Sequence, residues 1–410
     1  MMANNKRPYD LVLFGCTGDA GRAVAAFFGK HAGGTTWALA GRNVKKLEAL
    51  RASDAALARV PLVVADVGDA ASMDAMAKSC DLVVSAAGPY ALLGEAVVRA
   101  CVDHGTHYLD VTGEVHWVAE MATKYAGAAT ASCLASFGGY DCVPDEATVF
   151  AVSRAIGEPL AAAESVVDYG LEAGGPRGTI LTVLGLLGDP LRGARGWHAY
   201  MGLGKGCRAA ALRDLVYWGL PSFSSTLDCF TVPNFMGAIQ IPVVHRSGHD
   251  NGYVLDSFRF KDRMVLPGAR SLLTGKGALL YYAFVAFLFL ATPAFLVLAV
   301  LVRAPPVERA ARRLLEARSY GGSRAPTIVV TTTGHGAAGA SATATLRVRG
   351  DAGIVATAAL CGEVALAMVE AAAAGGLKAG FTTPVGALGD ALLARLEQSE
   401  TMSLVVAKAA

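Results

Sequence analysis

The sequence lacks several features that mark common classes of binding protein. Only 17% of its 410 residues are charged and the formal net charge is +2, so no concentrated basic surface for nucleic acid is indicated. The eight cysteines are scattered, with no CxxC pair and no metal-ligand spacing, which argues against a zinc site. We therefore expect no metal, and we interpret the cysteines as small buried hydrophobic residues in a reducing compartment.

No signal peptide is expected either, because the first apolar run already reads as the first strand of a fold. The nucleotide-binding part should then face the cytosol. The chain has a hydrophobic fraction of 53%, which is high, and its length is enough for two domains.

A glycine-rich turn is the most informative feature that is present. An apolar run at 10–14 leads into Gly15-Cys-Thr-Gly-Asp-Ala-Gly21, followed by a helix-like stretch at 22–28 and a second apolar run at 36–40. This order of strand, turn, helix and strand is the context that a dinucleotide-binding fingerprint requires. The spacing is GxxGxxG, which resembles the extended reductase and epimerase variant. We predict an α/β fold whose N-terminal part is a Rossmann domain with a doubly wound parallel sheet.

The second strand lacks the acid that usually holds the ribose 2′-hydroxyl of NAD. It ends instead at Gly41-Arg42-Asn43, with Lys45 and Lys46 beyond. A guanidinium can hold a 2′-phosphate that a carboxylate would repel. We therefore predict NADP, with NAD less favoured; the alternative is that Arg42 is a solvated residue at a helix start.

Further cofactor contacts are expected beyond the later strands. Asp66 follows the third strand, where it would bond the adenosine part or simply cap a helix. The turn at 87–90 follows the fourth strand and should border the nicotinamide. The predicted cofactor-binding residues are Gly15, Thr17, Gly18, Asp19, Ala20, Gly21, Arg42, Asn43, Asp66, Ala87, Gly88, Pro89 and Tyr90.

The rhythm of strands and helices changes after about residue 150, which indicates a second, α+β domain. We place the Rossmann domain at 1–150, a substrate or dimerisation domain at 151–395 and a tail at 396–410. Within the second domain, the alternation at 341–349 followed by Asp351-Ala-Gly353 predicts a hairpin with 354–358. A helix is expected near 361–374.

Several passages together resemble the saccharopine dehydrogenase-like oxidoreductases, a family that includes trans-acting enoyl reductases. They are Gly15–Gly21, Ala40–Asn43, Ala87–Tyr90, Gly105–Glu114, Gly138–Asp145, Gly174–Ile180 and Gly380–Pro384. The resemblance runs in order along nearly the whole chain and implies a Rossmann domain, a second sheet-containing domain and a reductase-like activity. Some members act on lipid intermediates and others are found on lipid droplets. The chain departs from the family pattern at Asp19, where an aromatic residue is common.

The run from Ala278 to Val302 carries no charge and is long enough to cross a bilayer. Positive residues precede and follow it, which favours cytosolic ends on both sides, and Pro293 can break a helix inside it. We predict a hairpin or interfacial insertion into a membrane or a lipid-droplet surface. A buried core helix or a dimer interface is the alternative.

Candidate catalytic residues lie beyond strands four to six: Tyr90, Asp110, Glu114, His116, Tyr140 and Asp141. We single out Tyr90, Tyr140 and Asp141 as proton donors or acceptors beside the nicotinamide. For each of them a structural role is an equally good interpretation. No Tyr-xxx-Lys pair of the short-chain reductase type stands at the expected place, which argues against a simple alcohol dehydrogenase mechanism. Arg177, in the second glycine-rich loop, could orient an anionic substrate or the cofactor phosphate.

Three functions fit these observations. The first is a membrane- or lipid-droplet-associated NADP-dependent oxidoreductase that reduces a lipid-linked double bond, carbonyl or imine in lipid or glycolipid metabolism. The second is a saccharopine-type amino-acid dehydrogenase, and the third a non-catalytic, cofactor-binding scaffold on lipid droplets. The expected partners are a lipid-like small molecule and a lipid surface, with a homodimer as an open option.

Overall fold

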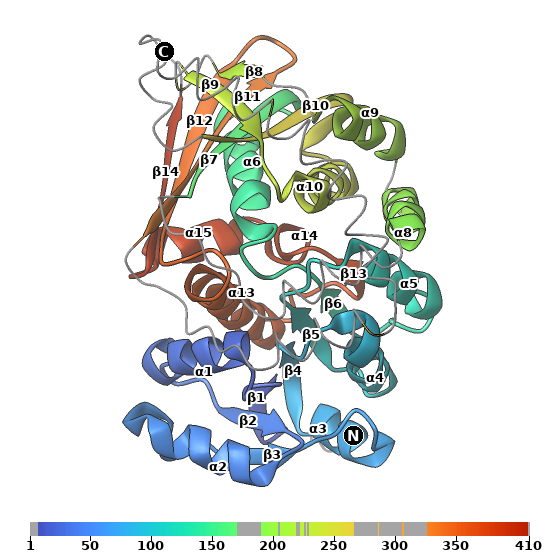
Figure 1. Ribbon diagram of the computed structural model, residues 1–410, viewed down its shortest axis with the longest axis vertical. Coiled ribbons are helices and arrows are strands. Elements are labelled where there is room, and N and C mark those ends of the chain that lie inside the picture. Colours follow the sequence, from blue (N-terminus) through green and yellow to red (C-terminus); the bar gives the residue numbers. More distant parts are fainter. Residues whose placement is uncertain are drawn as a thin grey trace. The chain divides into compact units, whose positions relative to one another are not determined.

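The computed structural model describes residues 7–169, 190–203, 206–218, 222–224, 227, 229–265 and 326–408, together with the single residues 286 and 306 (Figure 1). The chain forms two compact units. The first contains residues 1–143 and 352–401, and the second contains residues 144–351 and 402–410. Each unit is built around its own seven-stranded sheet.

The sheet of the first unit is parallel throughout, in the order β13-β6-β5-β4-β1-β2-β3. The central order 3-2-1-4-5-6 is that of doubly wound nucleotide-binding domains, so the predicted fold class is confirmed. The strands are β1 (Tyr9–Phe14), β2 (Trp37–Gly41), β3 (Leu62–Val64), β4 (Cys80–Ser85), β5 (His107–Asp110), β6 (Cys133–Ala135) and β13 (Gly380–Thr382).

Helices connect these strands and carry apolar faces that suit burial against the sheet. In α1, for example, Val24, Ala25 and Phe28 are buried. The helices are α1 (Asp19–His31), α2 (Val44–Ser53), the short η1 (Ala55–Leu57), α3 (Ala70–Lys78), α4 (Tyr90–Asp103), α5 (Val115–Tyr125), α13 (Val355–Ala373), α14 (Pro384–Leu388) and α15 (Asp390–Gln398).

The C-terminal part of the chain returns to the first unit, which differs from the predicted boundaries at 150 and 395. The strand β13 pairs with β6, and the helix α13 packs on α1. Gly362 allows that packing, because a Cβ there would stand 2.1 Å from the ring of Phe27. Residues 352–401 therefore complete the nucleotide-binding unit rather than the second domain.

The predicted hairpin between 341–349 and 354–358 is wrong. Residues 355–373 form α13, and the strand at 341–349 pairs instead with 327–336. The run at 354–358 is too short to reveal a period, and it continues into a helix that is buried on nearly all sides.

The second unit has a mixed sheet in the order β14-β12-β11-β7-β10-β9-β8, in which β7 and β10 are parallel and the other pairs are antiparallel. Its strands are β7 (Leu160–Asp168), β8 (Ser222–Ser224), β9 (Cys229–Pro233), β10 (Val254–Val265), β11 (Thr327–Gly336), β12 (Ser341–Arg349) and β14 (Met402–Lys408). Its helices are α6 (Val143–Ile156), α8 (Pro190–Leu203), α9 (Arg208–Trp218) and α10 (Gly237–Asn251). The predicted tail at 396–410 contains an edge strand, since β14 pairs with β12 along its whole length.

A buried polar network lies inside this second unit. Gln240 Nε2 donates to Asp145 Oδ2 (2.7 Å), and Asn234 Nδ2 donates to both Asp262 Oδ1 (2.9 Å) and Gln240 Oε1 (2.8 Å). The remaining oxygens, Asp145 Oδ1 and Asp262 Oδ2, are buried and have no hydrogen-bond partner among the described residues. Burial raises the pKa of Asp145 to about 7 and the pKa of Asp262 well above its usual range. At neutral pH at least one of the two carboxyls is therefore protonated.

Of the helices in the described ranges, α13 alone is long and apolar enough to cross a membrane. In its most apolar window 72% of the residues are buried inside the fold, so we interpret it as a core helix. The run at 278–302 lies outside the described residues except for position 286, and the glycine-rich loop with Arg177 lies wholly outside them.

Candidate functional site

The glycine-rich turn packs too closely for side chains at two of its three glycines. Gly15 has a φ of +79°, and a Cβ there would stand 2.8 Å from Ala87. A Cβ on Gly21 would stand 2.3 Å from the carbonyl oxygen of Gly15 and 2.8 Å from Cys16 Cα. The first and third glycines therefore let the turn lie against the end of β4 and let α1 lie against the turn.

Gly18 has a different role, because a Cβ there would meet nothing closer than 3.5 Å. It is exposed and is the N-cap of α1, where no side chain caps the helix. The neighbouring Thr17 carbonyl accepts from Arg22 Nε (3.0 Å), which holds the turn on the helix. The first-turn N–H groups at Asp19 and Ala20 thus form a place where a pyrophosphate can bind.

The two residues predicted at the end of β2, Arg42 and Asn43, have different environments. Asn43 is the N-cap of α2, and its Oδ1 accepts from Lys46 N (3.1 Å). Arg42 is exposed, and its side chain makes no hydrogen bond or ion pair with the residues that the structure describes. Asn43 therefore sets the start of the helix, while the Arg42 guanidinium remains available for a 2′-phosphate.

Asp66 follows β3 and holds the next turn. Its Oδ1 accepts from Gly68 N (3.0 Å), and its own N–H donates to Ser72 Oγ (3.0 Å). The carboxyl is partly exposed. Asp66 thus has a turn-forming role that does not depend on the cofactor.

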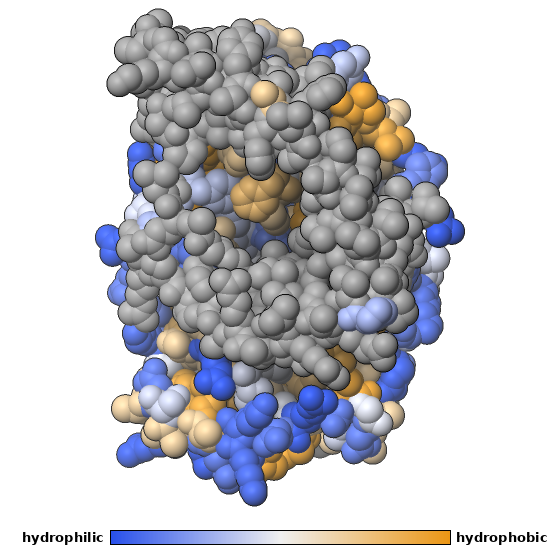
Figure 2. Space-filling model, in the orientation of Figure 1, coloured by the Kyte–Doolittle hydropathy of each residue, from blue (hydrophilic) through white to orange (hydrophobic). Residues whose placement is uncertain are grey.

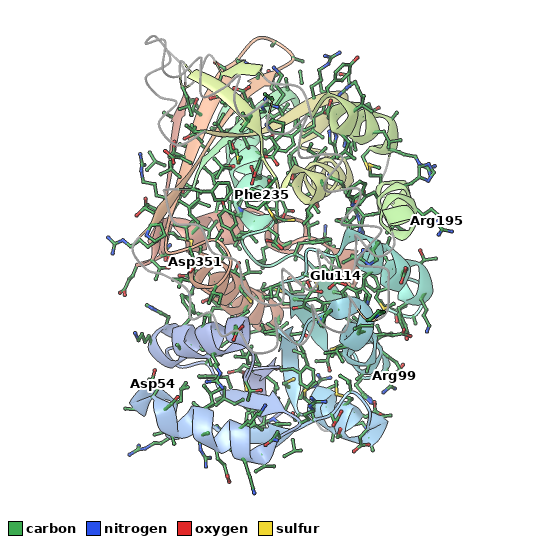
Figure 3. All side chains as sticks on the ribbon, in the orientation of Figure 1. Asp54, Arg99, Glu114, Arg195, Phe235 and Asp351 are labelled. Atoms are coloured by element: carbon green, nitrogen blue, oxygen red, sulfur yellow. The ribbon has the colours of Figure 1, made fainter. Side chains whose placement is uncertain are left out.

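Beyond β4, the carboxylate of Glu114 caps the helix that begins at Tyr90. Glu114 Oε1 accepts from Tyr90 N (3.0 Å) and Oε2 accepts from Ala91 N (2.8 Å). Glu114, which is labelled in Figure 3, is buried, with 3% of its surface exposed. This buried cap fixes the turn at Ala87, Gly88 and Pro89 where the fourth strand ends.

The Tyr90 side chain points into the first unit. Its hydroxyl donates to the Ser85 carbonyl (2.8 Å) and accepts from Val111 N (3.4 Å), and its ring packs against Trp117 at 5.4 Å between centroids. Burial raises the pKa of Tyr90 well above its usual range. This placement favours a structural role over proton donation.

We predict that Glu114→Gln destabilises the first unit. The substitution removes the charge from the N-terminus of α4 and turns one acceptor into a donor that faces a backbone N–H. We expect the free energy of unfolding to fall by about 1–3 kcal/mol, measured by urea denaturation. Glu95→Gln is the matched control. Glu95 lies on α4, the helix that Glu114 caps, and forms a more exposed ion pair with Lys124, so its substitution should cost less than about 1 kcal/mol. Equal losses in the two variants would contradict the capping role.

The ends of β5 and β6 are tied together by Asp110, which is fully buried. Its Oδ1 accepts from Phe137 N (3.0 Å), and Ser136 Oγ donates to its Oδ2 (3.1 Å). Burial raises the pKa of Asp110 to about 6. Phe137 has a φ of +69°, which is uncommon for a bulky residue, and this bond from its N–H to Asp110 helps to hold it there.

The turn after β6 brings Tyr140 and Asp141 to the carboxyl edge of the sheet, but it presents them differently. Tyr140 is 1% exposed, and its N–H donates to Thr357 Oγ1 (3.2 Å). Asp141 is partly exposed, and its surroundings raise the pKa of its carboxyl to about 6, chiefly by desolvation. Of the three predicted catalytic residues, Asp141 is thus the one that is partly exposed and has a pKa near neutral pH.

Sequence reasoning did not identify Thr357 as part of this site. It lies on α13, far along the chain from the turn that it supports. Gly139 packs against it, because a Cβ on Gly139 would stand 3.0 Å from Thr357 Cγ2. No local motif marks such a residue. Gly138 is similarly constrained, because a Cβ there would stand 2.6 Å from Leu109.

Comparison with known proteins agrees with this geometry. Residues 11–135 match the model of the saccharopine dehydrogenase NADP binding domain. The chain is 32% identical over 192 residues to a saccharopine dehydrogenase-like oxidoreductase of Rattus norvegicus, covering 43% of this chain and 44% of the relative. It is 32% identical over 203 residues to a lipid droplet localized protein of Caenorhabditis elegans (46% and 48%). It is 31% identical over 192 residues to a putative trans-acting enoyl reductase of Mycobacterium tuberculosis (45% and 46%).

The chain spans less than half the length of the curated relatives that it matches. Among solved structures, the apo saccharopine dehydrogenase (L-Glu forming) of Saccharomyces cerevisiae covers 98% of this chain and 100% of its own, with a TM-score of 0.56 and 15% identity. That likeness concerns the fold.

Proposed function

We propose that this chain is an NADPH-dependent reductase that acts at a lipid surface, because residues 11–135 match the model of the saccharopine dehydrogenase NADP binding domain. The observation that carries the proposal is the uncapped N-terminus of α1 beside the exposed Arg42, which together suit a pyrophosphate and a 2′-phosphate. The cofactor would supply the hydride. The protein's part is to bind and orient the cofactor and to move a proton.

The lipid link rests on the relatives and on the sequence. One relative is named a lipid droplet localized protein and another a putative trans-acting enoyl reductase. The uncharged run at 278–302 gives this chain an apolar segment of its own. We propose a lipid-linked double bond, carbonyl or imine as the substrate, and the cytosolic face of a membrane or lipid droplet as the place of action.

For the proton we propose Asp141, since its carboxyl is partly exposed with a pKa near 6. Tyr90 and Tyr140 then position the turns on either side rather than react. A saccharopine-type dehydrogenase and a non-catalytic scaffold are the competing functions.

An activity screen separates the three functions. NADPH binding is measured by quenching of protein fluorescence, and NADPH oxidation is then followed with enoyl-thioester, ketone and imine substrates, with saccharopine oxidation as a fourth assay. Turnover of an acyl substrate supports the proposal, and turnover of saccharopine alone refutes it. Tight binding without any turnover would favour the scaffold.

We predict that Arg42→Ala changes the cofactor preference. Loss of a charged hydrogen-bonding partner for the 2′-phosphate should weaken NADPH binding by about tenfold to a hundredfold while NADH binding stays within about twofold. The control is Arg51→Ala, which removes a positive charge from the last turn of the same helix α2. An equal loss of both cofactors, or none, would exclude Arg42 as the 2′-phosphate contact.

A further inference from the structure

The surface of α9 exposes an unusual group of apolar side chains. Val216 is 76% exposed, Tyr217 61% and Leu212 39%, and Leu203 at the end of α8 is 36% exposed. Leu212 and Val216 are four residues apart and so share one face of the helix. Figure 2 shows this hydrophobic patch over α9 at the upper right of the molecule.

The opposite face of α9 is already occupied. Ala210 and Ala211 are buried, and Ala211 packs with Met201 and Cys207 in a small apolar cluster. The exposed residues Leu212, Val216 and Tyr217 therefore form a second apolar face of α9. This face packs against no element in the described part of the second unit.

The segment that carries the patch has mostly positive charges. Between 190 and 218 the sequence has five arginines and lysines and a single acid, Asp214. Asp214 is buried and engaged, since its Oδ1 accepts from Arg213 Nε (2.9 Å) and its Oδ2 pairs with His245 Nε2 (2.9 Å). Arg195 and Arg208 are exposed on α8 and α9, with Arg195 on the outer side of α8 (Figure 3), so the segment presents basic side chains beside the patch.

We propose that the exposed face of α9, with Arg195 and Arg208 beside it, is a docking surface for an anionic lipid layer. Apolar side chains on one face of a helix, next to arginines, are the features of helices that lie in the lipid interface. The ring of Tyr217 suits the headgroup depth. A protein partner with an acidic surface is the competing occupant. The inference rests on the proposed lipid-surface function, but it assigns the contact to α9 and is separable from the apolar run at 278–302.

The test is flotation of the full-length protein with phosphatidylcholine vesicles, with and without about one third phosphatidylglycerol. We expect the wild type to float with the anionic vesicles. The double variant Leu212→Asp, Val216→Asp should bind about tenfold more weakly, because two carboxylates enter the apolar face. Val405→Asp is the matched control, since Val405 is 56% exposed on β14 of the same unit and should float as the wild type does.

A second pair of variants tests the charge. Arg195→Glu, Arg208→Glu should lose the preference for anionic vesicles, and NADPH binding should remain unchanged in every variant as the check on folding. Wild-type flotation by both double variants would overturn the docking surface while leaving a lipid-surface reductase intact. Failure of the wild type itself to float on either vesicle, with NADPH turnover retained, would overturn the docking surface and the lipid-surface part of the function together.

Discussion

Substitution of alanine for Gly21 is expected to weaken NADPH binding at least about tenfold and to lower the stability of the first unit. The new Cβ would lie 2.3 Å from the Gly15 carbonyl oxygen and 3.0 Å from its carbonyl carbon. Both atoms belong to the backbone, so the contact can be relieved only by moving the turn away from α1. We expect the NADPH dissociation constant to rise at least about tenfold, and the free energy of unfolding to fall by about 1–3 kcal/mol.

Two further glycines separate steric from ligand effects. Gly34→Ala meets nothing within 4 Å and has an ordinary φ, so both NADPH binding and stability should stay as in the wild type. Gly18→Ala has space within the protein, but it places a methyl group at the exposed helix start, so NADPH binding should weaken without loss of stability. NADPH titration measures the binding, and thermal denaturation the stability, of all three variants. Unchanged NADPH binding in Gly21→Ala would mean that the turn does not hold the pyrophosphate.

The first unit could be predicted from the sequence because its signals are local. The runs at 10–14 and 36–40 are short, apolar and bounded by turns, and each became a buried strand of the parallel sheet. The glycine spacing also indicated the close approach of the turn and the helix. Local pattern is sufficient where each strand is followed directly by the helix that covers it.

The contribution of the C-terminal region could not be predicted in the same way. Apart from Glu363 and Glu370, the helix α13 is apolar around nearly its whole circumference. Its sequence therefore shows no amphipathic face that would indicate which element it packs against. The strand β13 is three residues long and pairs with β6, which is remote in the chain. Neither a short edge strand nor a uniformly apolar helix carries a local mark of the unit to which it belongs.

The site was predicted in part for the same reason. Arg42 was identified because it follows a strand directly, and the structure leaves it exposed there. Glu114 and Thr357 support the turns at Tyr90 and Tyr140 through long-range hydrogen bonds. Such bonds depend on tertiary packing. The interior placement of Tyr90 likewise could not be read from its position after the Gly88-Pro89 turn.

The acid pair in the second unit predicts that stability depends on pH in an unusual direction. An aspartate in the unfolded chain has a pKa near 3.9. In the native protein, burial raises the pKa of Asp145 to about 7 and that of Asp262 well above its usual range. Between these values the native state binds more protons than the unfolded state, so the free energy of unfolding falls as pH rises. The stabilisation is complete below about pH 4 and is lost by the time the native carboxyls ionise.

Asp262→Asn should therefore stabilise the protein at alkaline pH. An asparagine can keep the acceptor for Asn234, and it stays neutral at alkaline pH, where the Asp262 carboxyl would have to ionise in a buried place. It also removes the like charge beside Asp145. We expect the variant to exceed the wild type by about 1–3 kcal/mol at pH 8. At pH 5, where the wild-type pair is protonated, the difference should be smaller. Urea denaturation from pH 5 to 9 measures both.

Asp256→Asn is the control on the same strand, β10, because Asp256 is exposed and its substitution should leave the pH profile unchanged. Each pKa unit of difference between the native and unfolded states corresponds to about 1.4 kcal/mol, so even a partial loss of the shift is measurable. A variant whose stability declines with pH as steeply as that of the wild type would show that Asp262 does not contribute to the pH dependence. A decline that is halved would assign the remainder to Asp145, which still ionises in the buried network.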